Sequence, residues 1–269
     1  MTDSTNCSLV STDGIAKFCV SNGIPYSGSD TGSLRRYLKE FPDNDFIFVS
    51  GLSDSTIPND FPEASSVIDN PKLKLWFSQN CVLGHPKLRQ IPIGLDYHTL
   101  SEGRAEHWGP KATPIEQEKQ LLSIKEKYPP FWERKKLGFC NFHFSNRRIQ
   151  DRQHAWSLPE KEALVFQDGW TSRKDTWTRM CEHAFVLSPH GVGLDCHRTW
   201  EALALGCIPI VKSSPLNPLF DDLPVWIVEE WSHVNGFRME QFIERTKNQA
   251  FNYEKLTLGY WTNKITSET

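Results

Sequence analysis

The second half of the chain alternates short apolar runs with helix-like segments, and this regularity constrains the fold more than any other feature. Five runs are predicted strands, at 137–144, 163–169, 184–189, 208–214 and 225–231. Predicted helices lie between them at 148–158, 172–183 and 195–206, the second with Ser172 as its candidate N-cap. Strands that alternate with helices at this spacing predict a parallel sheet with right-handed crossovers. The sequence therefore predicts an α/β fold.

The first half of the chain contains strands of the same kind, less regularly spaced. Three apolar runs are predicted strands, within 46–51, 73–81 and 88–98. A Gly/Ser-rich loop enters a helix near residue 30, with Asp30 or Ser33 as its cap. The charged stretch 101–135 is expected to form a solvent-facing helix and then a boundary, which divides the chain into two lobes of normal α/β size.

The composition excludes several classes of protein. The formal net charge is −3 and 23% of the residues are charged, so the chain as a whole is not built to bind nucleic acid. There is no run of about 18 apolar residues and no apolar leader, so we expect a soluble cytoplasmic protein without a membrane span. The 7 cysteines match no zinc spacing, which predicts a reducing compartment and no obligatory disulfides.

The segment 188–201 holds the densest cluster of chemically active side chains. Gly191 and Gly193 allow the backbone to turn and to approach a ligand closely. Asp195 is the predicted N-cap of a helix over 196–205. The N–H groups at the start of such a helix favour an anion, so the segment predicts an anion-binding loop.

Two side chains on this helix extend the prediction to a nucleotide. Arg198 is a cationic fork suited to phosphate, and Glu201, one turn later, is an acceptor suited to ribose hydroxyls. The alternative for this pair is a surface ion pair. Two further alternatives are a Cys196–His197 nucleophile and a metal site built from residues 190, 195 and 197. Adjacent helical residues point about 100° apart, which disfavours the nucleophile.

The same segment, extended to 189–211, resembles the hallmark of the exostosin-like glycosyltransferases. That hallmark runs Pro-Arg-Gly, a short loop, Ser-x-Arg, two residues, Glu-Ala-Leu, Gly-Cys and Ile-Pro-Val. In this chain it is PHGVGLDCHRTWEALALGCIPIV, with His190 in place of the family's arginine and Cys196 in place of its serine. The resemblance is strong over 135–235, and LWFSQN, IPIGLDYH and KLTLGYWTNKI resemble other segments of short members.

The resemblance implies a GT-B-type architecture, with two Rossmann-like lobes that face each other across a cleft. It implies an acceptor-side lobe at 1–130, a nucleotide-sugar-binding lobe at 131–250, and a C-terminal helix at 251–269 that packs back on the first lobe. It also implies inverting transfer of a sugar from a UDP-sugar to a saccharide or glycoprotein glycan. UDP-xylose is the first choice of donor, and neither a metal ion nor a bound cofactor is expected.

Three other functions stay open. A GDP-sugar-dependent, fucosyltransferase-like enzyme would share the architecture, and an inactive glycan-binding protein would share the lobes. A dinucleotide oxidoreductase is disfavoured because Cys196 occupies the third glycine position of the dinucleotide fingerprint. The Asp-Asn-Asp at 43–45 precedes a strand, so a turn is favoured there over a metal site.

The expected donor site gathers the loops that follow the strands of the second lobe. Its predicted members are Asn141, Arg148, Arg152, His190, Gly191, Gly193, Leu194, Asp195, Arg198 and Glu201. Arg147 and His143 are further donors in the first of these loops. The stretch 167–170, which includes Trp170, is expected to hold the base by backbone contacts and stacking.

An inverting transfer needs a base on the acceptor hydroxyl, and the resemblance places that base in the first lobe. Asp54, just past the strand at 46–51, is the first candidate. Asp96 and His98, past the apolar run that begins at residue 88, come next. Asp30 is the third choice, with helix capping as its favoured role.

Overall fold

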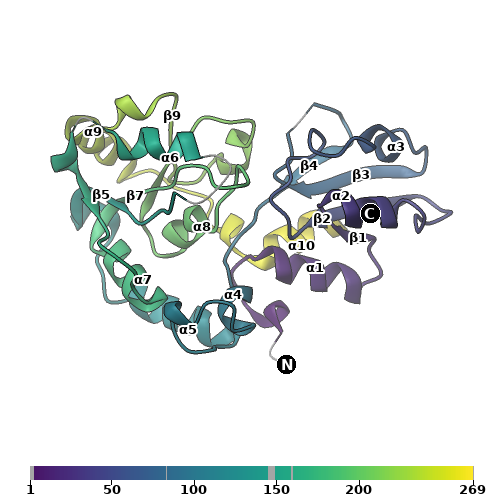
Figure 1. The fold of residues 1–269 in the computed structure, drawn as a ribbon, viewed down its shortest axis with the longest axis horizontal. Helices are drawn as coiled ribbons and strands as arrows, with labels where there is room; N and C mark the ends of the chain where they lie inside the picture. The colour runs from purple at the N-terminus through teal and green to yellow at the C-terminus, as the bar shows by residue number, and fades with distance from the viewer. Residues whose placement is uncertain (1–2, 83, 145–148, 159, 269) are drawn as a thin grey trace.

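The chain forms two lobes that lie side by side (Figure 1). The computed structural model describes residues 3–82, 84–144, 149–158 and 160–268. Each lobe is built on its own sheet, and all strand pairs within the two sheets are parallel. The α/β class predicted from the sequence is confirmed.

The sheet of the first lobe has the strand order β1-β2-β3-β4. Its strands are β1 Tyr26–Gly28, β2 Phe46–Gly51, β3 Leu73–Gln79 and β4 Leu88–Ile91. Every residue of β2 is buried, as expected of a parallel strand that is covered on both faces. This burial explains why β2 is an unbroken apolar run in the sequence.

The sheet of the second lobe has the order β6-β5-β7-β8-β9. Its strands are β5 Lys135–Cys140, β6 Leu164–Phe166, β7 His183–Leu187, β8 Ile208–Lys212 and β9 Trp226–Val228. The chain leaves β5 for β6 on one side and later returns to β7 on the other side. Ligands of open parallel sheets bind at such a switch point, outside the carboxyl ends of the two strands. The loops after Cys140 and Leu187 therefore mark the place to look for a site.

The predicted helices are present, and their caps explain where they begin. The helices of the first half are α1 Thr12–Ser21, α2 Thr31–Tyr37, α3 Ala64–Ile68, α4 His98–Ser101 and α5 Pro114–Lys125. Those of the second half are α6 Ile149–Trp156, α7 Arg173–Cys181, α8 His197–Ala204, α9 Gly236–Thr246 and α10 Leu258–Thr266. Asp30 and Ser172 cap α2 and α7, as predicted. None of the helices in the described ranges is long and apolar enough to span a membrane.

Helix α5 differs from the solvent-facing helix expected in its place. It packs against α7 and α8 of the second lobe, and its Leu121 is fully buried. Its Glu118 accepts the backbone N–H groups of Ser8 and Leu9, each at 2.8 Å, and the hydroxyl of Tyr97 at 2.8 Å. The charged residues that suggest a solvated helix thus include one carboxylate that holds the N-terminal segment.

The C-terminal helix α10 returns to the first lobe and packs against α1 (Figure 1). The N–H of Val10 donates to the carbonyl of Leu256 at 2.9 Å, and the N–H of Leu258 donates to Ser8 at 2.9 Å. One continuous cluster of buried apolar side chains contains residues of both lobes. The lobes are therefore joined by shared core as well as by the chain that links them.

Candidate functional site

A cavity of about 160 Å³ lies at the switch point of the second sheet. Its lining comes from the loops after β5 and β6, from α7 and α8, and from two first-half residues. The lining residues are Asp96, Trp108, Asn141, His143, Gln167, Trp170, Thr171, Arg173, Thr176, Trp177, His197, Arg198 and Glu201. The structure therefore brings together Asn141, Arg198 and Glu201, which the sequence predicts as donor-site residues.

Arg198 is the most informative side chain of this cavity. Its Nε donates to Asn141 Oδ1 at 2.7 Å, and its guanidinium lies 5.8 Å from the ring of Phe142. Its Nη1 is buried and has no hydrogen-bond partner among the described residues. Burial lowers the pKa of Arg198 to about 10, so the group stays cationic at neutral pH. A buried cation with an unused donor is costly unless a ligand supplies an acceptor.

Glu201 lies on the same cavity, one helical turn from Arg198. Burial raises the pKa of Glu201, and the charge of Arg173 works in the opposite direction. The indole N–H of Trp177, which lines the same cavity, makes no hydrogen bond among the described residues. Arg198 and Glu201 do not form the surface ion pair that was the alternative, because both line a cavity inside the lobe.

Two predicted donor contacts, Arg152 and His190, have a different role. Arg152 donates from Nε to the carbonyl of His190 at 3.1 Å and from Nη1 to the carbonyl of His143. Asp151 accepts the N–H of His190 at 2.8 Å, and its carboxylate lies 3.5 Å from Nδ1 of that ring. Neither side chain lines the cavity, because each is engaged in joining the two switch-point loops. The predicted Arg147 and Arg148 lie outside the described residues.

Of the two loop glycines, Gly193 allows a close approach between the lobes, whereas the neighbours of Gly191 belong to its own lobe. A Cβ added to Gly193 would lie 2.7 Å from Nδ2 of Asn80, a residue of the first lobe. The N–H of Gly191 donates to the carbonyl of Gly193 at 3.0 Å, so this amide is not available to an anion. Leu194 packs against the core shared by the lobes. None of these three residues lines the first cavity, and their contact with the donor stays a prediction.

Asp195 is not the N-cap of α8, which is Cys196 without a side-chain cap bond. The carboxylate of Asp195 instead accepts the N–H of Ile93 at 2.8 Å and the indole N–H of Trp200 at 2.9 and 3.0 Å. Its own N–H donates to Asn80 Oδ1 at 2.8 Å. Asp195 thus joins the second lobe to the first and does not face a ligand. Burial raises the pKa of Asp195 to about 6, although these hydrogen bonds favour its charged form.

The pKa of Asp195 predicts a specific pH dependence of stability. Raising it from 3.8 to about 6 disfavours the charged form in the folded protein by about 3 kcal/mol. The neutral Asp195 carboxyl therefore makes its full contribution to the unfolding free energy below pH 3.8, and this contribution is lost as the pH rises through about 6. Relative to the parent, the unfolding free energy of Asp195→Asn should rise by up to about 3 kcal/mol over this window.

Urea denaturation at a series of pH values measures this difference. Asp45→Asn is the matched control, because Asp45 is exposed and lies 3.9 Å from Lys74 on the surface. The raised pKa of Asp195 would be contradicted if the difference in unfolding free energy between the parent and Asp195→Asn were the same at acidic and at neutral pH.

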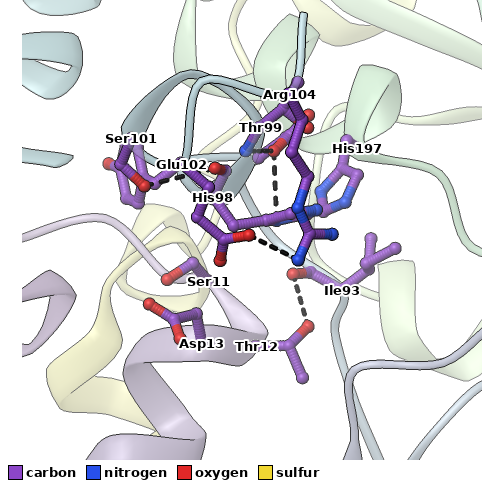
Figure 2. A network of polar contacts seen from close by, with 12 residues as sticks. Ser11, Thr12, Asp13, Ile93, His98, Thr99, Ser101, Glu102, Arg104 and His197 are labelled. Carbon is purple, nitrogen blue, oxygen red and sulfur yellow. Dashed lines mark hydrogen bonds and ion pairs between the residues drawn. The ribbon is translucent and has the colours of Figure 1, made fainter. Parts of the chain in front are cut away.

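A second cavity, of about 460 Å³, lies between the lobes and shares Asp96 and His197 with the first. Its lining residues are Thr12, Asp13, Leu52, Ser53, Asp54, Gln79, Ile93, Leu95, Asp96, His98, Thr99, Glu102, Arg104 and His197. Figure 2 shows His98, Arg104 and His197 around this space, which α1 borders from the other side. The structure therefore places the three predicted base candidates, Asp54, Asp96 and His98, on one cavity.

Asp96 is engaged in ion pairing and is a poor proton acceptor. Its Oδ2 accepts from Arg173 Nη2 at 2.7 Å, and its Oδ1 accepts the N–H of Thr99 at 3.0 Å. Burial raises the pKa of Asp96, but the neighbouring His197, Arg173 and His98 outweigh it and hold this pKa well below its usual value. Nδ1 of His98 lies 3.1 Å from Asp96 Oδ1. Asp96 can therefore fix the orientation and tautomer of His98, whose Nε2 is left to accept a proton.

The sequence indicated His197 only as part of a nucleophile or a metal site, and its position between the two cavities was missed. Its Nδ1 lies 2.7 Å from the carbonyl oxygen of Gly94, which can only accept, so Nδ1 carries the proton. Burial lowers the pKa of His197, with Asp96 opposing, so the ring is neutral at pH 7. The ring lies 5.7 Å from that of His98, at the junction of the two cavities. No local signal could have found it, because its partner Gly94 is distant in the sequence.

The remaining alternatives can be judged from the same contacts. Burial raises the pKa of Cys196, so this thiol is not an activated nucleophile. The described residues contain one group that could hold a metal ion, Asp96, His98 and His197, with ligand atoms within 4.8 Å of one another. The guanidinium of Arg173 already binds Asp96 and would repel a divalent cation there. This donor set therefore fits a metal ion poorly.

No protein family model matches the chain, and no curated protein matches its sequence. The class that fold and site define is a two-lobed α/β protein with a cavity at the switch point of one sheet, lined by the two cations Arg173 and Arg198 and by the two carboxylates Asp96 and Glu201.

Proposed function

We propose that the protein is an inverting glycosyltransferase of the GT-B type that uses a UDP-sugar. The observation that carries the proposal is Arg198, a half-buried side chain that lines a cavity at the switch point of a parallel sheet and whose buried Nη1 has no partner among the described residues. Arg198 lies in the first turn of α8, so the helix dipole adds to its positive charge. Together they suit the diphosphate of a nucleotide sugar, which gains negative charge as the sugar leaves.

The rest of the first cavity suits the nucleoside. Glu201 offers carboxylate oxygens to ribose hydroxyls, in keeping with its place one turn after the phosphate-binding Arg198. Trp170 is 66% exposed at the rim, and its ring stacks with that of His143 at 4.7 Å. An exposed, oriented indole suits stacking on a base. The two cavities, about 160 and 460 Å³, adjoin through Asp96 and His197, which leaves room for the sugar between them.

His98 is the base in this mechanism, in preference to Asp54. His98 lines the second cavity with its ring 5.7 Å from that of His197, which lines both cavities, whereas Asp54 lies on the second cavity and on its outer neighbour. Nε2 of His98 takes the proton of the acceptor hydroxyl, and the hydroxyl oxygen attacks C1 of the sugar from the side opposite the diphosphate. The bond from C1 to the diphosphate oxygen breaks, Arg198 stabilises the charge of the departing UDP, and the anomeric configuration inverts.

A nucleotide screen tests the proposal. UDP at about 100 times its dissociation constant stabilises a protein by about 2.7 kcal/mol, which should raise Tm by about 5–10 °C in a chain of this size. UDP should stabilise the protein more than GDP, CMP or NAD, and one UDP-sugar should be slowly hydrolysed. Preferred stabilisation by GDP would indicate the fucosyltransferase-like alternative. Stabilisation by NAD, or by no nucleotide, would overturn the proposal.

A chelator tests the second part of the proposal, that transfer needs no metal ion. Activity should be unchanged by an excess of EDTA, because Arg173 occupies Asp96 in the one group of described residues that approaches metal-ligand geometry. Loss of activity with EDTA, restored by a divalent cation, would contradict this prediction.

A further inference from the structure

The first lobe's wall of the cleft carries an acidic groove. A cavity of about 890 Å³ lies beside the second cavity and shares Leu52, Ser53 and Asp54 with it. Three carboxylates line it, those of Asp30, Asp54 and Asp60. The described residues that line it include no lysine, arginine or histidine. A ligand in this groove therefore meets negative charge only.

Backbone N–H groups hold two of these carboxylates in place, those of Asp30 and Asp60. Asp30 accepts the N–H of Ser33 at 2.9 Å, and Asp60 accepts the N–H of Thr56 at 2.7 Å. Within the described ranges, no ion pair joins Asp30, Asp54 or Asp60 to a basic side chain. Backbone N–H groups orient a carboxylate and favour its charged form, but they leave its charge in place. The groove is therefore negatively charged at neutral pH.

The inner end of the groove reaches the proposed reacting centre. The second cavity, which the groove joins, is lined by His98. The other charges there are balanced in pairs, since Glu102 pairs with Arg104 and Asp13 pairs with Lys17 at 2.8 Å. The cleft is thus divided by charge, with cationic Arg198 on the donor side and unpaired carboxylates on the opposite side.

The groove also has the mixed surface that a sugar ring requires. Leu52 is 51% exposed and has a φ of 56°, and its N–H donates to Gln79 Oε1 at 3.1 Å. This bond holds an apolar side chain in the floor that the two cavities share. The hydroxyl residues Thr31, Ser53 and Ser55 line the same groove. A pyranose has apolar C–H faces and a rim of hydroxyls, and carboxylates accept pairs of such hydroxyls.

We propose that the groove lined by Asp30, Asp54 and Asp60 is the acceptor subsite, and that it selects saccharides without negative charge. Neutral sugars donate hydroxyls to the carboxylates, and amino sugars add an attraction between opposite charges. Uronic-acid, sulfated or phosphorylated sugars are repelled, because like charges face each other across the interface. This inference rests on the proposed function, since the groove is an acceptor subsite only if the cavity at Arg198 binds the donor.

Three trisaccharides with one backbone test the charge selection. Chitotriose is neutral, its N-deacetylated form is cationic, and its C6-oxidised form is anionic. Binding is measured by ligand-observed NMR with UDP present. The cationic form should bind most tightly and the anionic form at least about tenfold more weakly than the neutral one. These differences should shrink as salt rises from about 0.05 to 0.5 M, because salt screens exposed charges.

Variants of the groove identify the residues responsible. Asp54→Asn and Asp60→Asn should each raise the affinity for the anionic trisaccharide relative to the neutral one by about threefold to tenfold. Asp45→Asn, exposed and absent from the lining of the cleft cavities, should leave this ratio unchanged. Because the readout is a ratio within one protein, a general loss of folded protein does not imitate the effect.

Three results would overturn the inference. They are equal or tighter binding of the anionic trisaccharide, an unchanged ratio in both groove variants, and no binding of the neutral and cationic forms at millimolar concentration. Stabilisation by UDP and hydrolysis of the UDP-sugar are measured on the same preparations without any trisaccharide. If these persist while the order of binding is reversed, the charge selection alone is wrong. If they are absent, the proposed function itself fails.

Discussion

Replacing Arg198 by alanine should abolish detectable UDP binding while leaving the unliganded protein folded. Truncating one partner of a buried, hydrogen-bonded charge pair typically costs 2–5 kcal/mol, so the UDP dissociation constant should rise by about 30-fold to several thousand-fold. The unliganded protein should lose little stability. The substitution removes one bond to Asn141 but also removes a buried cation whose Nη1 has no partner in the described structure.

Two further variants separate a phosphate contact from a general effect of charge. Arg198→Lys keeps the charge but loses the planar fork, so its UDP affinity should lie between those of the parent and Arg198→Ala. Arg245→Ala is the matched control, because Arg245 is exposed on α9, away from both cavities. Isothermal calorimetry gives the affinities and a thermal scan without nucleotide gives the stabilities. Unaltered UDP affinity in Arg198→Ala would refute the phosphate role.

Apart from β1, which has only three residues, the strands of the described residues could be predicted from the sequence because a doubly covered parallel sheet leaves a strong local signal. All of β2 and β7 is buried, and both appear as unbroken apolar runs. Helix caps such as Asp30 and Ser172 are equally local, since each bonds an N–H three residues later. The relation of α5 to the lobes was not predictable, because Glu118 contacts Ser8 and Leu9 more than a hundred positions earlier.

The residues of the candidate site also differ in whether their contacts are local or distant in the sequence. Arg198 and Glu201 could be singled out because their spacing places both on one face of one helix. Asp195 and Gly193 were misinterpreted because their partners, Ile93 and Asn80, belong to the other lobe. A glycine kept for close approach looks the same in a sequence whether the approaching group is a phosphate or a neighbouring asparagine. Only the fold distinguishes the two cases.

The structure also changes the rank of the proton acceptors. Asp54 follows a strand end, and that position was the only signal the sequence offered for it. In the proposed mechanism His98 ranks first because Asp96 Oδ1 lies 3.1 Å from its Nδ1 and because its ring lies 5.7 Å from that of His197, which lines both cavities. Asp96 lines both cavities and is fixed in orientation, but its carboxylate is engaged by Arg173, which leaves His98 as the base of the proposed mechanism. Asp54 then belongs to the acceptor groove.

His98→Gln should reduce kcat by about 10²- to 10⁴-fold, the usual contribution of a general base, with UDP affinity unchanged. His85→Gln is the matched control, because His85 is exposed.

Asp96→Asn should also lower kcat, because the bond that orients His98 is lost. It should lower stability as well, because Arg173 loses the charge that it binds. Single-turnover transfer separates these effects from product release. If His98→Gln keeps transfer within about threefold of the parent, while Asp54→Asn abolishes it with UDP bound normally, the base is Asp54 and the mechanism proposed here is wrong.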